Sequence, residues 1–140
     1  MNNNVRGIIA ALVATIVLTV LMLLKGMMGM MPELNVAAML GDQMGGSIAM
    51  GWVAHFVIGV IIYGLVFANL RGVLPGGSNL VKGIVLAIIG WLIMMIVLMP
   101  MMGAGMFAMS MGMMAAVATL VLHIIFGLVL GLTYDKVGSN

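Results

Sequence analysis

Residues 7–24 of the chain read GIIAALVATIVLTVLMLL, a run without a single charged side chain. A helix needs about 20 predominantly apolar residues to cross the hydrocarbon core of a bilayer. Beyond Lys25, Gly26, Met27 and Met28 extend this stretch, so we expect a membrane-spanning helix over residues 7–28. Three further stretches of this kind predict membrane-spanning helices over residues 49–70, 81–102 and 113–134.

The composition of the whole chain supports a membrane protein. Its 140 residues are 65% hydrophobic and 6% charged, whereas soluble domains are about 45–50% apolar and about 25% charged. Five Lys and Arg residues are too few for a nucleic-acid interface, and the lack of cysteine excludes disulfides, iron–sulfur clusters and thiolate chemistry. We therefore expect an all-α integral membrane four-helix bundle, a single transmembrane domain over residues 1–140 whose surroundings are the lipid bilayer.

The first predicted helix could be confused with a signal peptide because Arg6 precedes the apolar run. The run is too long for a usual signal-peptide core, and Lys25-Gly26-Met27 is a poor cleavage site, so we expect a retained helix.

Two connections carry structural signals. In residues 29–48, Pro32 opens a turn, residues 32–40 form a candidate short helix at the membrane interface, and Gly45-Gly46 would end it. Pro100, with the Gly103-Ala104-Gly105 segment, is expected to break the third span near its end.

The distribution of basic residues predicts the orientation. Arg6, Arg71, Lys82 and Lys136 fall at the N-terminus, the middle turn and the C-terminus, which share one side if four helices cross. Only Lys25 falls on the other side. The positive-inside rule then places both termini in the cytoplasm.

The two halves of the chain resemble each other. Arg6-Gly7-Ile8-Ile9 at the start of the first span parallels Lys82-Gly83-Ile84-Val85 at the start of the third. The second and fourth spans share the pattern His-x-x-x-Gly. Although any two apolar hairpins have some likeness, the order of these features predicts two tandem helical hairpins related as a parallel repeat, with a pseudo-twofold axis along the membrane normal.

The only two histidines, His55 and His123, lie within the second and fourth spans, each four residues before a glycine, Gly59 and Gly127. An ionisable residue at membrane depth costs free energy, about 2.5–3.5 kcal/mol for a charged group at a helix centre. We expect these four residues to form a cofactor site and the two histidines to be candidate metal ligands. The ordinary alternative is a hydrogen bond to a neighbouring helix.

Helical spacing predicts which residues share the histidine faces. One stripe is Gly51, His55, Gly59 and Tyr63, and the other is Thr119, His123, Gly127 and Gly131. Small residues allow close helix contact, so both stripes should face the bundle interior. Two inward imidazoles could ligate haem b iron, bind a transition metal or pass protons. Among the aromatic residues, Trp52 and Tyr134 are expected to mark the outer and inner interfaces, and Trp91 to serve packing.

Apart from Met1, the 19 methionines lie within residues 22–50 and 94–114, which gathers them toward the predicted extracytoplasmic end. Two groups are expected beside each other at this end: Met27, Met28, Met30 and Met31 after the first span, and Met99, Met101, Met102 and Met106 at the end of the third. Thioether sulfur favours Cu(I), so a copper-binding collar is conceivable. Methionine is also a pliable apolar residue that fills irregular gaps, and we expect this role.

Nothing in the sequence points to an enzyme. The acids Glu33, Asp42 and Asp135 lie at or beyond the membrane ends, and no serine has a nearby base.

Three segments carry a family resemblance: LLKGMMGMMPEL (residues 23–34), GWVAHF (51–56) and LHIIFG (122–127). With these, the chain resembles an uncharacterised family of small bacterial and archaeal four-helix membrane proteins. The resemblance implies a bacterial or archaeal inner-membrane protein and no particular activity.

Three functions follow as hypotheses. The first is a non-enzymatic membrane component in which His55 and His123 line an internal polar or cofactor site for haem b or copper. The second is a small ion or proton transporter, and the third is a structural subunit with membrane-protein partners or further copies of itself.

Overall fold

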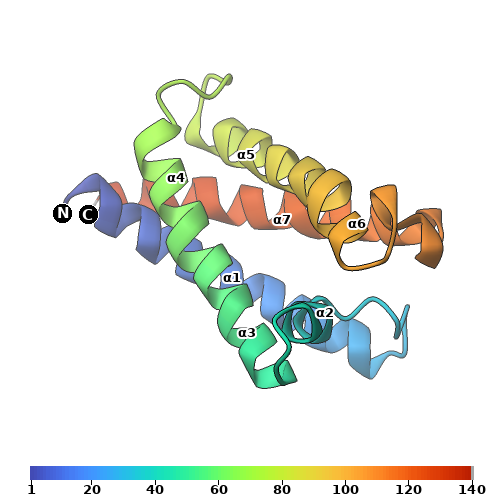
Figure 1. The fold of residues 1–140 in the computed structure, drawn as a ribbon. Coiled ribbons are helices and arrows are strands. Elements are labelled where there is room, and N and C mark those ends of the chain that lie inside the picture. The colour runs from blue at the N-terminus through green and yellow to red at the C-terminus, as the bar shows by residue number, and fades with distance from the viewer. Residues whose placement is uncertain (140) are drawn as a thin grey trace.

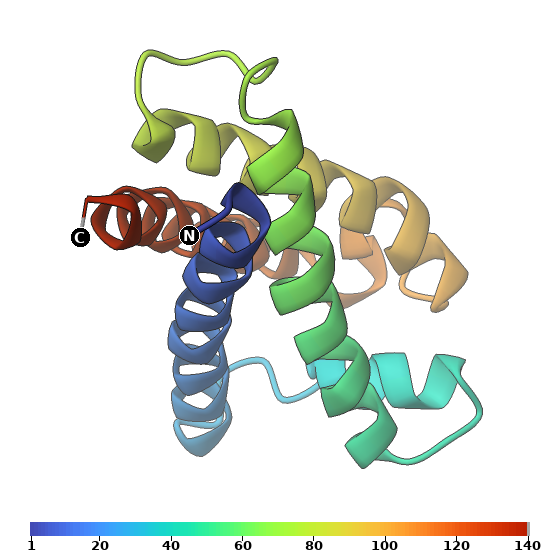
Figure 2. The same ribbon diagram turned by 90° about the vertical axis from the view of Figure 1, so that its left-hand side faces the viewer.

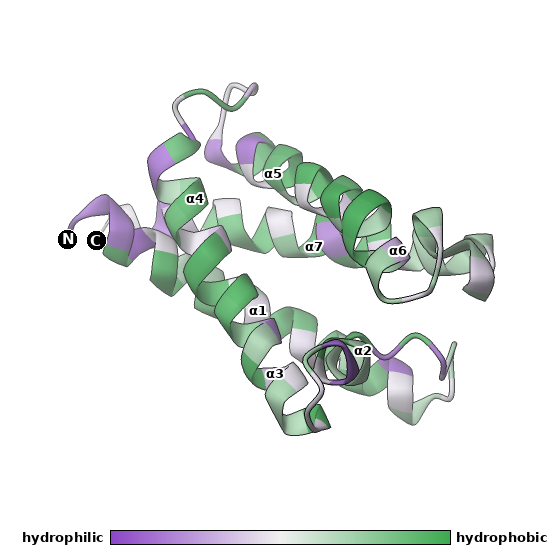
Figure 3. Ribbon diagram, viewed as in Figure 1, coloured by the Kyte–Doolittle hydropathy of each residue, from purple (hydrophilic) through white to green (hydrophobic). Residues whose placement is uncertain are grey.

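The computed structural model describes residues 1–139, which fold into helices without a strand among them. Four helical stretches are long and apolar enough to cross a membrane: Asn3–Met27, Ile48–Leu70, Asn79–Met101 and Met113–Gly138. Their middle parts are hydrophobic, and polar residues gather at the end with both termini and in the connections (Figure 3). This distribution fits a membrane-embedded protein.

The helical elements follow one another along the chain with short connections. They are α1 (Asn3–Met27), α2 (Val36–Gln43), α3 (Ile48–Phe56), the π-helical segment η1 (Val57–Ile62), α4 (Tyr63–Leu70), α5 (Asn79–Ile93), the π-helical segment η2 (Met94–Leu98), α6 (Met99–Met101), the 3₁₀ segment η3 (Met106–Met111) and α7 (Met113–Gly138). The second span is therefore α3–η1–α4, and the third is α5–η2–α6.

Capping explains where two helices begin. The Asn2 side chain accepts a hydrogen bond from the Val5 amide, so α1 starts one turn before the apolar run. The Asn35 side chain accepts from the Ala38 amide, which makes Asn35 the cap of α2. The short interfacial helix thus lies later than residues 32–40, and it ends just before Gly45, whose φ is +68°.

The third span ends near Pro100 and the Gly103–Gly105 segment, as predicted, although Pro100 itself lies inside the helix. The helix passes through Pro100 to Met101, and the turn before it is π-helical over Met94–Leu98. Proline lacks an N–H group and clashes with the carbonyl four residues earlier. A π-helical turn relieves both problems because its hydrogen bonds skip one residue more. The chain leaves the helix only at Gly103, whose φ is +82°.

The helices form two pairs that meet at one end. The helix α1 packs along η1 and α4, α5 packs along α7, and α1 and α7 contact each other between the two pairs. The pairs lie close together near the termini and diverge toward α2 and α6 (Figures 1 and 2).

Glycines allow each pair to approach closely. A Cβ on Gly7 would overlap with the Gly64 carbonyl oxygen, and a Cβ on Gly83 would overlap with that of Gly127. In both hairpins, the glycine after the basic residue of the first span therefore contacts a glycine of the second. This parallel is compatible with a tandem repeat, which stays a prediction.

Two buried clusters stabilise the ends of the molecule. The cluster near the termini contains Ala10, Ala11, Ala14, Phe67, Ala68, Leu86, Phe126, Leu130 and Tyr134. The cluster at the other end contains Leu34, Met94, Met95, Met99, Ala104, Ala108, Ala115 and Ala116. Between the diverging helix pairs, the space is not filled by side chains.

Candidate functional site

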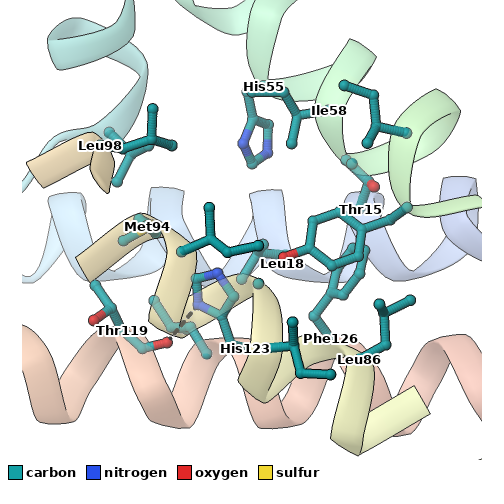
Figure 4. A pocket seen from close by; sticks show the side chains of 18 of the residues that line it. Thr15, Leu18, His55, Ile58, Leu86, Met94, Leu98, Thr119, His123 and Phe126 are labelled. Atoms are coloured by element: carbon teal, nitrogen blue, oxygen red, sulfur yellow. Dashed lines mark hydrogen bonds between the residues drawn. The ribbon is translucent and has the colours of Figure 1, made fainter. Parts of the chain in front are cut away.

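A cavity of about 450 Å³ lies between the two helix pairs. Its size falls within the range of about 300–1,000 Å³ that is typical of small-molecule sites. Most of its lining is aliphatic or aromatic, and both histidines belong to it (Figure 4). The polar side chains that line it are Thr15, Lys25, His55, Tyr63, Thr119 and His123.

His55 reaches the cavity from α3 and is 8% exposed. Its Nε2 lies 3.2 Å from the Thr19 hydroxyl oxygen, and that hydroxyl donates its only hydrogen to the Thr15 carbonyl at 2.7 Å. The imidazole must therefore donate from Nε2 to Thr19, which leaves a lone pair on Nδ1 of the neutral ring. The rings of Trp52 and Phe56 lie edge-on to His55, each at a centroid distance of 5.5 Å.

His123 reaches the cavity from α7. Its Nδ1 lies 2.7 Å from the Thr119 carbonyl oxygen. Because a carbonyl can only accept, Nδ1 carries the hydrogen and the lone pair of the neutral ring lies on Nε2. Thr119 itself is held in place by the Trp91 indole N–H, which donates to its hydroxyl at 3.0 Å and to the Ala116 carbonyl at 3.2 Å. Trp91 therefore does more than pack.

The two imidazoles point into the cavity from opposite walls, one from each helix pair (Figure 4). Each ring has one nitrogen engaged by the protein and one lone pair without a protein partner among residues 1–139. Histidines that bind metals have this arrangement, since the hydrogen bond on one nitrogen fixes the tautomer and orientation of the other. The same lone pairs could accept hydrogen bonds from a ligand.

The structure places the two predicted site glycines differently. Gly59 lines the cavity, and its Cα faces the Thr15 side chain of α1. Gly127 lies in the contact between α5 and α7, where a Cβ would overlap with the Gly83 carbonyl oxygen. The geometry gives Gly127 a packing role and does not place it on the cavity wall.

The residues of a predicted stripe do not all contact the same neighbour, as the second span shows. Gly51 contacts α2, Gly59 contacts α1, and the Tyr63 hydroxyl contacts Gly90 of α5. Four residues advance an α-helix by about 400°, so each step of four turns the face by about 40°. Over three steps, and across the π-helical segment, this drift carries the side chains to different partners.

Sequence reasoning missed Thr19 and the position of Tyr63. Thr15 and Thr19 are the only polar side chains in residues 7–24, and this signal could have pointed to a partner for a buried histidine. Tyr63 packs edge-on against Phe126 at a centroid distance of 5.0 Å and touches Gly90, so it joins the two helix pairs across the cavity. Only the fold shows that contact.

A metal centre finds limited support in the donor set. Within residues 1–139, no group of three or more His, Asp or Glu side chains could hold a metal ion. Two imidazoles alone would need further ligands, from an exogenous group such as a porphyrin or from the Met22, Met94 and Met102 side chains that also line the cavity.

The methionine collar does not form one cluster. Met27, Met28 and Met101 are 83%, 71% and 58% exposed, so their side chains face away from the protein interior. Met99 is fully buried in the hydrophobic cluster near α6, against which Met31 and Met102 pack. This division between lipid-facing surface and core fits a packing role for the methionines.

Comparison with known proteins identifies the family of the chain. The family of unknown function DUF6789 matches the chain over residues 1–140. The chain belongs to the DUF6789 family. No curated protein and no solved structure matches it. This membership agrees with the family resemblance of the sequence. Because the function of the DUF6789 family is unknown, only the cavity can indicate an activity.

Proposed function

We propose that this protein is a non-enzymatic membrane component that binds a lipid-soluble cofactor in the cavity between its two helix pairs, with haem b as the first candidate. The observation that carries the proposal is the pairing of two imidazoles on opposite walls, each with its N–H engaged and its second nitrogen available. Axial histidine ligation of haem iron uses such a nitrogen.

The walls of the cavity favour an apolar, bulky ligand. Around the histidines, they consist mainly of aliphatic side chains from α1, α4 and α5, together with Phe126. Such walls suit a macrocycle or another lipid-soluble ring system whose polar groups are few. The divergence of the helix pairs away from the termini supports access from that end (Figure 1).

An ion or proton pathway has less support. Between the histidines and the end with the termini, the cavity is lined by Val66, Leu70, Leu74 and Leu86, which offer no polar group to an ion. Tyr63 also bridges the space to α5. A purely structural subunit would need neither the cavity nor the free imidazole nitrogens.

Charge distribution supports an orientation for the proposed site. With both termini in the cytoplasm, the histidine cavity would open toward the outer half of the bilayer. A cofactor there would lie near the extracytoplasmic face of a cell membrane.

The test is an absorption spectrum with metal analysis on the purified protein, before and after reconstitution with haem. We expect a Soret band and about one iron per chain, with the band lost or shifted in His123→Leu and His55→Leu. Tyr63→Phe is the matched control because it keeps the ring in the cavity and removes no imidazole. A wild type that takes up no haem after reconstitution, or a band that survives in both histidine variants, contradicts the proposal.

A further inference from the structure

Two arginines surround one buried tyrosine at the end of the molecule where both termini lie. The Arg6 Cζ is 4.0 Å from the centroid of the Tyr134 ring, and the Arg71 Cζ is 5.0 Å from it. The sum of these distances means that the two positive charges are no more than about 9 Å apart. Tyr134, which is expected to mark the inner membrane interface, is fully buried beneath the arginines.

Hydrogen bonds hold the two guanidinium groups in place. Arg6 donates from Nη2 to the Tyr134 carbonyl oxygen at 2.9 Å, and Arg71 donates from Nε to the Tyr134 hydroxyl at 3.0 Å. The arginine at the α1 start thereby also contacts the negative end of the α7 dipole. These bonds leave Arg6 Nη1 and both Arg71 Nη groups without a hydrogen bond to residues 1–139.

Among the carboxylates of residues 1–139, none neutralises the charges of this pair. Within residues 1–139, neither arginine forms a hydrogen bond with a carboxylate, and the adjacent Asp135 instead accepts from the Asn79 side chain at 2.6 Å. Like charges at this separation repel each other. An anion that contacts both guanidinium groups would remove that repulsion.

We propose that Arg6 and Arg71 bind the phosphate of an anionic phospholipid headgroup. Guanidinium groups present paired N–H donors that match phosphate oxygens. Arg6 Nε is buried without a hydrogen-bond partner, but both side chains as a whole are only half-buried, so their free Nη groups remain reachable. They lie at the polar end of the spans, where headgroups lie, and basic residues at this level attract anionic lipids (Figure 3). Free phosphate shares the chemistry and is distinguished by experiment.

Such a headgroup would lie where three helices meet at the closed end. Arg6 belongs to the first turns of α1, Arg71 follows α4, and Tyr134 lies near the end of α7. The phosphate would thus bridge α1 and the end of α4 within one helix pair, above the Tyr134 ring of α7 that both arginines contact, at the end of the molecule away from the histidines. The site is independent of what the cavity binds.

Native mass spectrometry of the detergent-solubilised full chain tests the site with equal amounts of phosphatidylglycerol and phosphatidylcholine of the same acyl chains. We expect the wild type to retain phosphatidylglycerol preferentially and Arg71→Gln to lower this retention by about fivefold. The matched control, Lys136→Gln, removes the same charge from an exposed residue two positions after Tyr134 and should retain the lipid as the wild type does. Arg71→Lys keeps the charge and supplies a second variant if Arg71→Gln does not fold.

Two results would overturn the proposal. Equal retention of both lipids by the wild type would show that no anionic headgroup is selected. An equal loss of phosphatidylglycerol in Arg71→Gln and Lys136→Gln would show that the lipid responds to the overall charge and not to the arginine pair. In a third arm, inorganic phosphate is added at the concentration of the lipid. Displacement of phosphatidylglycerol would assign the site to free phosphate instead of lipid, whereas unchanged retention supports the lipid headgroup.

Discussion

At the scale of single residues, glycines allow helices to pack closely, and a threonine orients a histidine. Gly7, Gly64, Gly83 and Gly127 let helix backbones touch, and a Cβ on any of them would overlap with or crowd the facing backbone. In lipid, such close packing contributes to association because no hydrophobic effect draws the helices together. Thr19 shows a second role, since its hydroxyl fixes the tautomer of His55.

Alanine substitution of two glycines in α1 separates the contribution of close helix packing from that of helix propensity. Gly7→Ala should lower the free energy of unfolding by about 1–3 kcal/mol because the new methyl group meets the Gly64 carbonyl. Gly26→Ala has nothing within 4 Å and should be neutral or stabilising by up to about 1 kcal/mol. Unfolding in mixed detergent micelles measures both variants, and equal effects would contradict the packing role.

At the scale of elements, side chains link neighbouring helices at the histidine level. Trp91 on α5 donates to Thr119 and to the Ala116 carbonyl on α7, and Thr119 also supplies the carbonyl that orients His123. Thr19 on α1 has the same function for His55 on α3. Each histidine is therefore oriented by a threonine, within its own helix pair.

Replacing Trp91 tests the link between α5 and α7. Trp91→Phe removes the indole donor, and we expect a loss of about 0.6–1.7 kcal/mol beyond that of the control, the range for hydrogen bonds between membrane helices. The control is Trp52→Phe, since Trp52 forms no hydrogen bond with residues 1–139 and also lies within a span. Thermal or detergent-induced unfolding gives both values. If the two variants lose the same stability, the hydrogen bonds contribute nothing measurable.

At the scale of the whole molecule, two helix pairs meet near the termini and part toward the other end (Figure 2). Arginines surround Tyr134 at the closed end, and methionines of α5–η2–α6 fill the buried cluster at the open end. The cavity between the pairs results from this divergence. Its histidines face each other only because the two pairs are arranged in this way.

Reporter fusions test the orientation of the molecule. Fusions at the C-terminus and within residues 72–79 should report a cytoplasmic location, and a fusion within residues 33–46 should report the outside. The reason is that four of the five basic residues lie at the end with the termini. An outward C-terminus would contradict this orientation, and a fusion within residues 72–79 on the same side as residues 33–46 would mean that one span does not cross.

The amino-acid sequence alone was sufficient to predict an all-helical protein with four long apolar helices. Long apolar runs leave only a helix as a way to satisfy backbone hydrogen bonds in lipid, so length and composition predict four helices. The same reasoning singled out His55 and His123, because an ionisable residue inside such a run costs free energy and therefore suggests a function. Boundaries set by polar caps, such as Asn2 and Asn35, were read less well, since capping depends on local hydrogen bonds.

The tertiary structure decided what those residues do. Helical spacing placed Gly127 and His123 on one face, yet the drift of that face and the approach of α5 put Gly127 into a helix contact and His123 into a cavity. For Tyr134, periodicity gave no sign that two arginines enclose its ring. Periodicity describes one helix at a time, whereas cavities and charge clusters depend on the distances and angles between helices, which no single segment encodes.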